Sequence, residues 1–296
     1  MKHLTNIEQL TVEEINQIYQ RACEFEKGMR SANHPSGNVI NMFFENSTRT
    51  RLSFEMAINK INAKIFDFKA DISSINKGED LFDTINNLSA IGLNLVIMRH
   101  SDDKLIEQLS SNIYYNDVSF VNAGSGISSH PTQALLDYCV LKKHFLNLEN
   151  KIITFVGDIA HSRVAKSNIV LLKKFGMKIR CLCPSYFMGE KIPDVEYFED
   201  LHSALYGCDV VMALRIQKER IQENIDYNDY IKRFQLTKDN LPYAVLLMHP
   251  GPVNWGIELS NDISQLQNSK TILRQAHTGV YTRMAILDIL LSGQGL

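Results

Sequence analysis

The chain has 296 residues and a formal net charge of -2, with hydrophobic and charged fractions of 45% and 22%. These fractions are typical of a globular protein and exclude a disordered chain, a collagen-like chain and a coiled-coil rod. At about 100–200 residues per domain, the length predicts two domains or one large one. Since positive charge is not in excess, neither nucleic acid nor a membrane surface is an expected partner.

The cysteine pattern and the N-terminus bear on the compartment. The five cysteines are an odd number and show neither a paired disulfide framework nor metal-ligand spacing. The opening MKHLTNIEQL lacks the apolar stretch of a secretory signal, and no uninterrupted apolar run reaches the roughly 18 residues of a membrane helix. We therefore expect a reduced, cytoplasmic protein without a metal site.

The first half of the chain alternates between helical and strand patterns. Apolar residues at helical spacing predict a first helix over 5–27. The polar, weakly patterned segment 70–79 predicts a loop. The remaining patterns predict strands at 39–44, 65–68, 93–98 and 118–121, and helices at 48–60, 81–92 and 130–145.

The pattern restarts after the polar stretch LNLENK at 146–151. It then predicts strands at 152–156, 179–182, 210–214 and 244–248, and helices at 162–175, 201–206 and 275–291. Strands that alternate with helices form parallel βαβ units. Two such runs, joined near 130–150, predict an α/β fold of two domains, each a parallel β-sheet flanked by helices.

Polar clusters follow five of the predicted strands. They lie at 45–49, 99–100, 158–163, 215–217 and 249–254, and several contain an arginine. In open parallel sheets, ligands bind beyond the carboxyl ends of the strands. The guanidinium fork stays charged and matches a carboxylate or a phosphate. The sequence therefore predicts an anionic small molecule as the ligand.

The segment STRTR at 47–51 lies between a predicted strand and a predicted helix. Its hydroxyl side chains are suited to capping the helix, which is one interpretation. Two arginines in a first helical turn oppose the helix dipole, at a cost of about 0.3–1 kcal/mol each. A phosphate bound to the free N–H groups of the turn reverses that cost, so a phosphate site is the favoured interpretation.

Two further segments, one at a helix start and one after a predicted strand, are suited to contact a ligand. His130, Pro131, Thr132 and Gln133 begin a helix, and His130 is suited to donate to a carbonyl oxygen while Gln133 holds an amide. The stretch HPGP at 249–252 stiffens a turn and removes two backbone donors, which leaves carbonyls for a ligand amine. Each segment alone is also compatible with a rigid connection of no chemical role.

The arginines of the second half have two interpretations each. The turn that begins at Gly157 contains one glycine, so it lacks the fingerprint of a dinucleotide site. Arg163 at its end either holds a carboxylate or is exposed to water. Arg215, directly after a buried strand pattern, either binds a ligand or forms an ion pair at the strand end.

These segments together, in this order, resemble the transcarbamylases and in particular their aspartate branch. The resemblance spans nearly the whole chain, and the ornithine branch would carry a cysteine-containing HCLP element that this chain lacks. Two positions depart from the family pattern: Ser125 stands where aspartate is common, and Trp255 where arginine is common. The residues that carry the resemblance are FFENSTRTRLSFE (43–55), MRH (98–100), HPTQALLD (130–137), GD…SR (157–163), LRIQKER (214–220) and HPGPVN (249–254).

The resemblance implies a reaction and a domain plan. The family transfers the carbamoyl group of carbamoyl phosphate to L-aspartate, which gives N-carbamoyl-L-aspartate and phosphate. This reaction is the committed step toward pyrimidines. It implies a carbamoyl-phosphate domain over 1–145, joined by the C-terminal helix at 275–296, and an aspartate domain over 146–274. No cofactor is implied, because the amine attacks the carbonyl carbon directly and the leaving phosphate accepts its proton.

The resemblance also assigns roles to single residues. Thr50, Arg99 and His130 polarise the carbamoyl carbonyl. Aspartate is bound by Lys77, Arg163, Arg215 and Gln217. Carbamoyl phosphate is bound by Ser47, Thr48, Arg49, Thr50, Ser73, Lys77, Arg99, His130 and Gln133, and by the carbonyls of Pro250 and Gly251.

Quaternary structure follows from the resemblance as well. Ser73 and Lys77 match residues that the family inserts into the site of a neighbouring subunit, which implies a homotrimer with shared active sites. The sequence leaves open whether a regulatory chain or a dihydroorotase partner joins the trimer.

Three other functions compete with this interpretation. A transcarbamylase for another amino acid is disfavoured because Arg163 and Arg215 suit a dicarboxylate, whereas an ornithine analogue needs an acidic pocket. A nicotinamide-dependent oxidoreductase is disfavoured by the missing glycine fingerprint. A silent carbamoyl-phosphate-binding or assembly protein is disfavoured by the intact set Arg49, Lys77, Arg99, His130 and Arg215.

Overall fold

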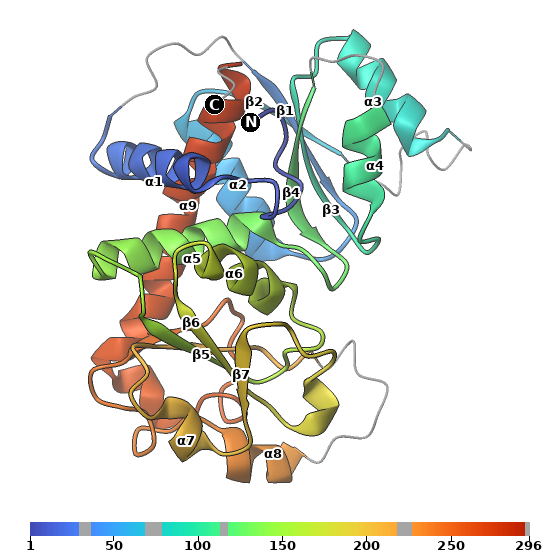
Figure 1. Cartoon of the computed structure of the whole chain (residues 1–296). Coiled ribbons are helices and arrows are strands. Elements are labelled where there is room, and N and C mark those ends of the chain that lie inside the picture. Colours follow the sequence, from blue (N-terminus) through green and yellow to red (C-terminus); the bar gives the residue numbers. More distant parts are fainter. Residues whose placement is uncertain (30–36, 69–78, 113–117, 218–226, 294–296) are drawn as a thin grey trace. The chain divides into compact units, whose positions relative to one another are not determined.

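The computed structural model of the chain describes residues 1–29, 37–68, 79–112, 118–217 and 227–293 (Figure 1). The chain divides into two compact units. Unit 1 comprises Met1–Cys139 and His277–Leu296, and unit 2 comprises Val140–Ala276. These limits fall inside two helices, whereas the sequence analysis placed them at 145/146 and 274/275, and the domain limits stay a prediction.

Unit 1 contains a parallel four-stranded sheet within its described residues. Its strand order is β2-β1-β3-β4, with bounds Lys64–Asp67, Asn38–Phe43, Leu95–His100 and Ser119–Ser125. On one face of the sheet, Ile40, Met42 and Val96 pack with Ile85 of α3 (Leu81–Ala90) and Leu109 of α4 (Leu105–Asn112). Burial of this apolar face drives the packing of helix on sheet.

In the described part of the chain, four further helices contribute to unit 1, and two of them, the third and the fourth, continue into unit 2. They are α1 (Val12–Glu26), α2 (Thr48–Lys60), α5 (Pro131–His144) and α9 (Lys270–Leu291). Arg21 of α1 donates from Nε to Asp288 of α9 at 2.6 Å, and Arg283 of α9 donates to Ser53 of α2 at 2.9 Å. The C-terminal helix therefore returns to unit 1, as expected.

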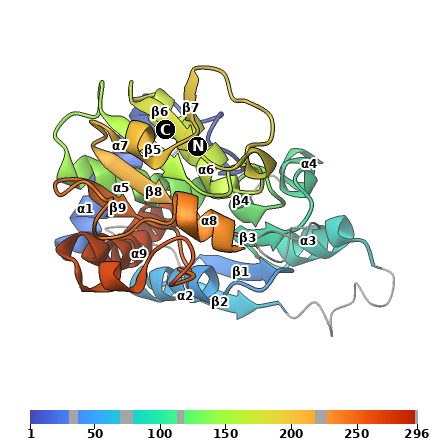
Figure 2. The same cartoon turned by 90° about the horizontal axis from the view of Figure 1, so that it is seen from below.

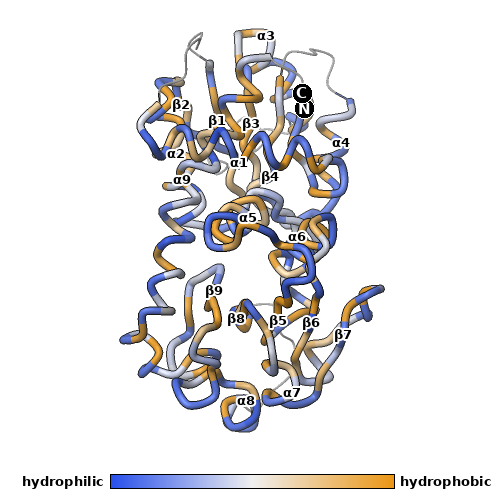
Figure 3. Tube along the Cα trace, turned by 60° about the vertical axis from the view of Figure 1, so that its left-hand side comes forward, coloured by the Kyte–Doolittle hydropathy of each residue, from blue (hydrophilic) through white to orange (hydrophobic). Residues whose placement is uncertain are grey.

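Unit 2 contains a parallel five-stranded sheet within its described residues, seen from below in Figure 2. Its central strands consist mostly of hydrophobic residues (Figure 3), as buried parallel strands do. The strand order is β7-β6-β5-β8-β9, with bounds Val195–Phe198, Lys178–Leu182, Ile152–Val156, Val210–Ala213 and Leu246–Met248. Its other elements are α6 (Arg163–Lys173), α7 (Leu201–Leu205) and α8 (Tyr227–Phe234), with 3-10 turns at Ser185–Phe187, Asn261–Gln265 and Gln267–Ser269.

Each sheet contains one point at which the chain reverses its direction of strand addition. In unit 1, β2 is added on one side of β1 and β3 on the other. In unit 2, β6 is added on one side of β5 and β8 on the other. Ligands of doubly wound sheets bind beyond the carboxyl ends of the two strands at such a point. The topology therefore directs attention to the ends of β1 and β3, and to the ends of β5 and β8.

The predicted fold class, two α/β domains with parallel sheets, is confirmed, but several elements differ. The first helix begins at Val12 instead of 5, because Thr11 and Glu14 form a reciprocal capping box there. Leu4 instead lies beside β4, where its N–H donates to the Phe120 carbonyl at 2.7 Å. The sequence analysis missed α4, α8 and the half-exposed edge strand β7.

Candidate active site

The first group of predicted site residues lies where β1 leads into α2. Ser47 occupies the N-cap position, yet within the described residues its side chain makes no capping hydrogen bond. The first turn of α2 also contains no acidic residue. By contrast, Ser162 accepts a hydrogen bond from the N–H of Ala165 and so caps α6. The 47–50 turn thus combines hydroxyl groups with the positive end of a helix dipole, an arrangement suited to a phosphate.

The two arginines of this turn face different surroundings. Arg51 donates to Glu55 at 2.9 Å and to Asp67 at 2.8 Å, which assigns it to ion pairs within unit 1. Arg49 is exposed, as is Thr48, while Ser47 and Thr50 are half-buried. Arg49 is therefore accessible from solvent, and its role in binding an anion stays a prediction.

Arg99 lies at the end of β3, the neighbouring strand at the reversal point. Its Nε donates to Glu45 at 3.1 Å, and Glu45 is the second residue after the end of β1. The pairing of β1 with β3 sets Phe43 opposite Arg99. The guanidinium of Arg99 is thus held beside the segment that leads into the 47–50 turn.

His130 and Gln133 begin α5, which follows β4. His130 is buried at 5% exposure and Gln133 at 8%. The Gln133 side chain donates from Nε2 to Asp137 at 3.0 Å. Since His100 of β3 is paired with Ser125 of β4, the start of α5 follows the same edge of the sheet. Ser73 and Lys77 lie outside the described residues.

In unit 2, the end of β5 closely approaches the end of β8. A Cβ atom at Gly157 would lie 2.9 Å from the Leu214 carbonyl oxygen, and the backbone there has φ +125°. The single glycine of this turn therefore serves the packing of two neighbouring strand ends. Asp158 follows it and is fully buried.

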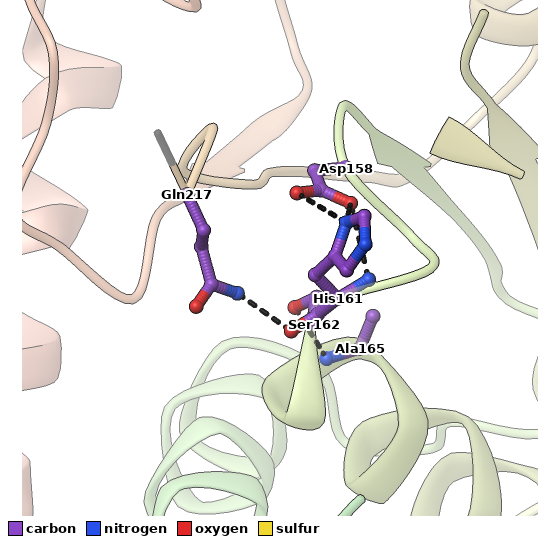
Figure 4. Close-up of polar contacts among 5 residues, drawn as sticks. All are labelled: Asp158, His161, Ser162, Ala165 and Gln217. Atoms are coloured by element: carbon purple, nitrogen blue, oxygen red, sulfur yellow. Dashed lines mark hydrogen bonds and ion pairs between the residues drawn. The ribbon is translucent and has the colours of Figure 1, made fainter. Parts of the chain in front are cut away.

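The turn after Asp158 is held by a local polar network (Figure 4). Asp158 Oδ1 accepts from the His161 backbone N–H at 3.1 Å and lies 2.9 Å from Nδ1 of the same residue. Gln217 donates from Nε2 to the His161 carbonyl oxygen at 2.7 Å. The network thus joins the segment after β8 to the segment after β5, and it orients Gln217.

Arg163 and Arg215 follow the ends of the same two strands. Arg163 is the first residue of α6 and is only 5% exposed, so the alternative of a water-exposed arginine is wrong. Burial and the positive helix end both disfavour a cation there, and a bound carboxylate offsets that cost. Arg215 is half-buried beyond β8.

The turn that contains Pro250 and Gly251 is fixed by buried polar groups. His249 accepts at Nδ1 from the Gly251 N–H at 2.7 Å, so its proton lies on Nε2, which is 3.3 Å from Glu258. Glu258 also accepts from the Asn254 N–H at 2.7 Å. These contacts orient the carbonyl groups of the turn.

Sequence reasoning assigned no individual role to three residues that support these turns. Asp158 and His161 lie within the quoted GD…SR segment, and their polar character directly after a strand was the available signal. Glu258 lies four residues past Asn254 and gave no signal of its own. Its burial becomes evident only in the folded chain.

The described residues of both units contain no group of three His, Cys, Asp or Glu side chains arranged to hold a metal ion. A thiol nucleophile beside Asp158 is also disfavoured, because burial, together with the Asp158 charge, raises the pKa of Cys183 to about 12. The chemistry of the described site residues is therefore hydrogen bonding and charge, supplied by arginine, histidine, hydroxyl and amide groups.

Comparison with known proteins places the chain in a family. The family model "Aspartate/ornithine carbamoyltransferase, carbamoyl-P binding domain" matches residues 2–143. The model "Aspartate/ornithine carbamoyltransferase, Asp/Orn binding domain" matches residues 149–290. Two similar proteins are the aspartate carbamoyltransferase catalytic subunits of Wolbachia pipientis subsp. Culex pipiens, 40% identical over 98% of each chain, and of Gluconobacter oxydans, 39% identical over 98% of this chain and 95% of the relative.

Solved structures agree with the sequence comparison. The catalytic subunit of M. jannaschii aspartate transcarbamoylase is 28% identical, with a TM-score of 0.87 over 99% of both chains. Aspartate transcarbamoylase from Trypanosoma cruzi in complex with carbamoyl phosphate is 26% identical, with a TM-score of 0.85 over 97% of this chain and 95% of that one. The chain belongs to the aspartate/ornithine carbamoyltransferase family, among the aspartate carbamoyltransferase catalytic subunits.

Proposed function

We propose that this chain transfers the carbamoyl group of carbamoyl phosphate to the amine of L-aspartate, the committed step of de novo pyrimidine biosynthesis. The products are N-carbamoyl-L-aspartate and phosphate. The observation that carries the proposal is the place of the motifs: each unit presents its predicted anion-binding turn at the reversal point of its own sheet. The T. cruzi relative, crystallised with carbamoyl phosphate and aspartate and also with carbamoyl aspartate and phosphate, supports the same substrates.

The phosphate group is bound by the 47–50 turn. Ser47, Thr48 and Thr50 offer hydroxyl groups, the first turn of α2 offers N–H groups, and Arg49 offers a guanidinium fork. Arg99 adds a second cation from the end of β3. Ser73 and Lys77 complete this set in the proposal.

The carbonyl carbon of the carbamoyl group becomes tetrahedral during the reaction, and negative charge develops on its oxygen. Thr50, Arg99 and His130 are the proposed donors to that oxygen. Preorganised donors of this kind contribute about 3–4 kcal/mol each to transition-state stabilisation. Gln133 and the carbonyl oxygens of Pro250 and Gly251 orient the carbamoyl nitrogen.

The carboxylates of aspartate are bound by Arg163, Arg215 and Gln217, with Lys77 as a further cation. The aspartate amine then attacks the carbonyl carbon, a C–N bond forms and the C–O bond to phosphate breaks. The electron pair of the broken bond remains on the leaving phosphate, which also accepts the proton of the amine. No protein nucleophile takes part, so the catalytic power comes from orientation and electrostatics.

A bisubstrate analogue tests this function directly. N-(phosphonacetyl)-L-aspartate, found in a T. cruzi relative, combines a phosphonate with the two carboxylates of aspartate. By calorimetry we expect it to bind much more tightly than phosphonoacetate or succinate alone, because one molecule satisfies both sets of residues. Equal affinities for the analogue and for its parts would overturn the proposal.

We further propose that the enzyme is a cytoplasmic homotrimer whose active sites receive Ser73 and Lys77 from a neighbouring subunit. All five cysteines are free thiols, which suits a reducing compartment. Among the described residues, no helix is long and apolar enough to cross a membrane.

Hybrid trimers test the shared site. Lys77→Ala and Arg49→Ala subunits are each expected to be inactive. Mixed together, they regain activity, because some sites then receive Lys77 from one subunit and Arg49 from another. Absence of any regained activity would refute the sharing of sites. Mass measurement of the purified enzyme in the same experiment reports whether it is a trimer, and its activity without added proteins reports whether a regulatory chain or a dihydroorotase partner is needed.

A further inference from the structure

A buried cation on α9 lies beside the helix that carries the 47–50 turn, yet the roles above do not use it. Arg283 is 4% exposed. Its Nη1 donates to Ser53 Oγ at 2.9 Å, and its Cζ lies 5.0 Å from the centroid of the Phe54 ring. Ser53 and Phe54 belong to α2. Burial of a guanidinium costs free energy unless charged or polar groups lie close to it.

The helix itself makes room for this side chain. A Cβ atom at Gly279 would lie 2.7 Å from Arg283 Nη1 and 3.1 Å from Leu136 Cδ2. Side chains on a helix lean toward its N-terminus, so Arg283 covers the turn that contains Gly279. Alanine favours a helix more than glycine does, yet here it would displace the guanidinium from Ser53.

Arg283 lies against α5, because its Nη1 and Leu136 Cδ2 both border the same point beside Gly279, and the negative charge of the next residue of α5, Asp137, acts on it. Burial lowers the pKa of Arg283 from its ordinary 12.5 to about 10, while the negative charge of Asp137 acts in the opposite direction. Arg283 is therefore still a cation at neutral pH. Asp137 is fully buried on α5, and a nearby cation favours its ionised form.

An ionised Asp137 decides which end of the Gln133 amide faces it. A carboxylate accepts hydrogen bonds and cannot donate them, so Gln133 must present its NH2 group to Asp137, at 3.0 Å. The amide oxygen of Gln133 then remains for a ligand. A protonated Asp137 is able to donate to that oxygen, which would turn the amide and present NH2 to the ligand instead.

We propose that Arg283 is a positioning residue that keeps Asp137 ionised and thereby fixes the Gln133 amide with its oxygen toward the carbamoyl NH2 group. The consequence is selectivity for carbamoyl phosphate, whose carbonyl carbon carries an NH2 group, over an acyl phosphate whose carbonyl carbon carries a methyl group instead. This inference rests on the proposed function, because that function supplies the ligand that Gln133 meets.

Two ligands distinguish this role from a purely structural one. Acetyl phosphate has the phosphate and carbonyl of carbamoyl phosphate but a methyl group in place of NH2. A residue that only stabilises the fold affects both ligands alike. A residue that orients Gln133 affects carbamoyl phosphate alone. The measurement is therefore the dissociation constant of acetyl phosphate divided by that of carbamoyl phosphate. Both constants are obtained by calorimetry at low temperature on the full-length protein.

We expect the wild-type protein to prefer carbamoyl phosphate. Arg283→Met and the isosteric Asp137→Asn should each raise the dissociation constant of carbamoyl phosphate by about tenfold, the value of one oriented hydrogen bond. The dissociation constant of acetyl phosphate should stay unchanged. Gly279→Ala keeps Arg283 but should also weaken the binding of carbamoyl phosphate relative to that of acetyl phosphate. Because Asp137→Asn and Gly279→Ala preserve side-chain volume or add one methyl group, they keep the test available if Arg283→Met does not fold.

Arg21→Met is the matched control. Arg21 is the other arginine that joins α9 to a neighbouring helix, through Asp288 at 2.6 Å. Its loss should lower the melting temperature and leave the ratio unchanged. Equal weakening of both ligands in the Arg283 and Asp137 variants, or an unchanged ratio, overturns the inference while the proposed function stands. A wild-type protein that binds neither ligand overturns the proposed function itself.

Discussion

The 47–50 turn of unit 1 and the 158–163 turn of unit 2 occupy equivalent positions in their sheets but differ in helix capping and in the exposure of their arginines. Both follow a strand at the reversal point of a parallel sheet, and both lead into a helix that carries an arginine in its first turn. In unit 1 the helix start makes no side-chain cap among the described residues, and Arg49 is exposed. In unit 2 Ser162 caps the helix, and Arg163 is buried.

This difference matches the two substrates. A phosphate has several equivalent oxygens, so an uncapped helix start with hydroxyl groups and an exposed arginine satisfies it from many directions. A carboxylate of aspartate must be distinguished from other groups. Arg163 is buried two residues after His161, which the Asp158 and Gln217 hydrogen bonds hold in place, and a planar guanidinium binds a carboxylate in a more restricted geometry than a helix start does. We infer that unit 1 supplies affinity for charge, and unit 2 supplies selectivity.

The largest expected effect is at the exposed arginine of unit 1. Arg49→Ala removes the proposed phosphate fork and should lower kcat/KM for carbamoyl phosphate by about 1,000-fold, which corresponds to about 4 kcal/mol. Because Arg49 is exposed, the melting temperature should hardly change. Steady-state kinetics with carbamoyl phosphate varied, together with thermal unfolding, measures both.

Arg51→Ala is the control for that variant. Arg51 lies two residues away but pairs with Glu55 and Asp67. Its loss should cost about 0.2–1 kcal/mol of stability, as for other exposed ion pairs, and leave kcat/KM near the wild-type value. Activity like that of the wild type in Arg49→Ala, or equal losses in both variants, would refute the assignment of the phosphate site.

The second effect tests geometry in unit 2. Arg163→Lys keeps the charge but loses the planar fork, and we expect kcat/KM for aspartate to fall by about 100-fold. The dissociation constant for carbamoyl phosphate alone should stay near the wild-type value. A lysine variant with normal kinetics would show that unit 2 needs only charge, and the contrast between the units would then disappear.

The third effect sharpens the role of the local network. Gln217→Ala removes the bond to the His161 carbonyl and the proposed contact with aspartate, and should raise KM for aspartate by about tenfold. Gln235→Ala is a matched control, since Gln235 also donates to a backbone carbonyl of unit 2, that of Gly256. An unchanged KM in Gln217→Ala would remove this residue from the aspartate site.

The smallest effect concerns the stability of unit 1 in acid. Burial, and to a lesser degree the charge of Lys2, lowers the pKa of His3 from its ordinary 6.5 to about 4. Between these values the unfolded chain binds a proton that the folded chain does not, so this contribution is fully present above pH 6.5 and is lost as the pH falls toward 4.

His3→Gln should flatten that dependence. Glutamine keeps an acceptor for the Phe120 N–H, which His3 now meets at 3.2 Å. Because His3 is only partly buried and solvent screens its charge, we expect the variant to lose about 1–2 kcal/mol less than the wild type over this interval, which is under the full value of the shift, measured by urea unfolding. His202→Gln, at an exposed histidine of unit 2, is the control. Parallel pH curves for wild type and His3→Gln would contradict the assignment.

Much of this arrangement could be predicted from local sequence. Segments such as 152–156 and 210–214 are continuous apolar runs that end in polar residues, so both the strands and the ligand-facing turns were recognisable. The return of the C-terminal helix to the first unit and the roles of Gln133 and Arg215 came from the resemblance instead. Periodicity alone does not contain that information.

Other features could not be predicted because they depend on long-range contacts. Strand β7 is half-exposed and short, so it lacks the apolar run that marked the other strands. The partner of Arg283 lies 230 positions away in the sequence. The ion pair of Arg51 follows from the position of β2, which places Asp67 2.8 Å from its guanidinium.

The most direct test of the central claim is the initial rate of carbamoyl transfer by the purified chain, with carbamoyl phosphate and either L-aspartate or L-ornithine as acceptor. Arg163, Arg215 and Gln217 suit two carboxylates, so we predict carbamoyl-aspartate formation and no measurable transfer to ornithine. Equal or faster transfer to ornithine, or no transfer to either amino acid, would contradict the account.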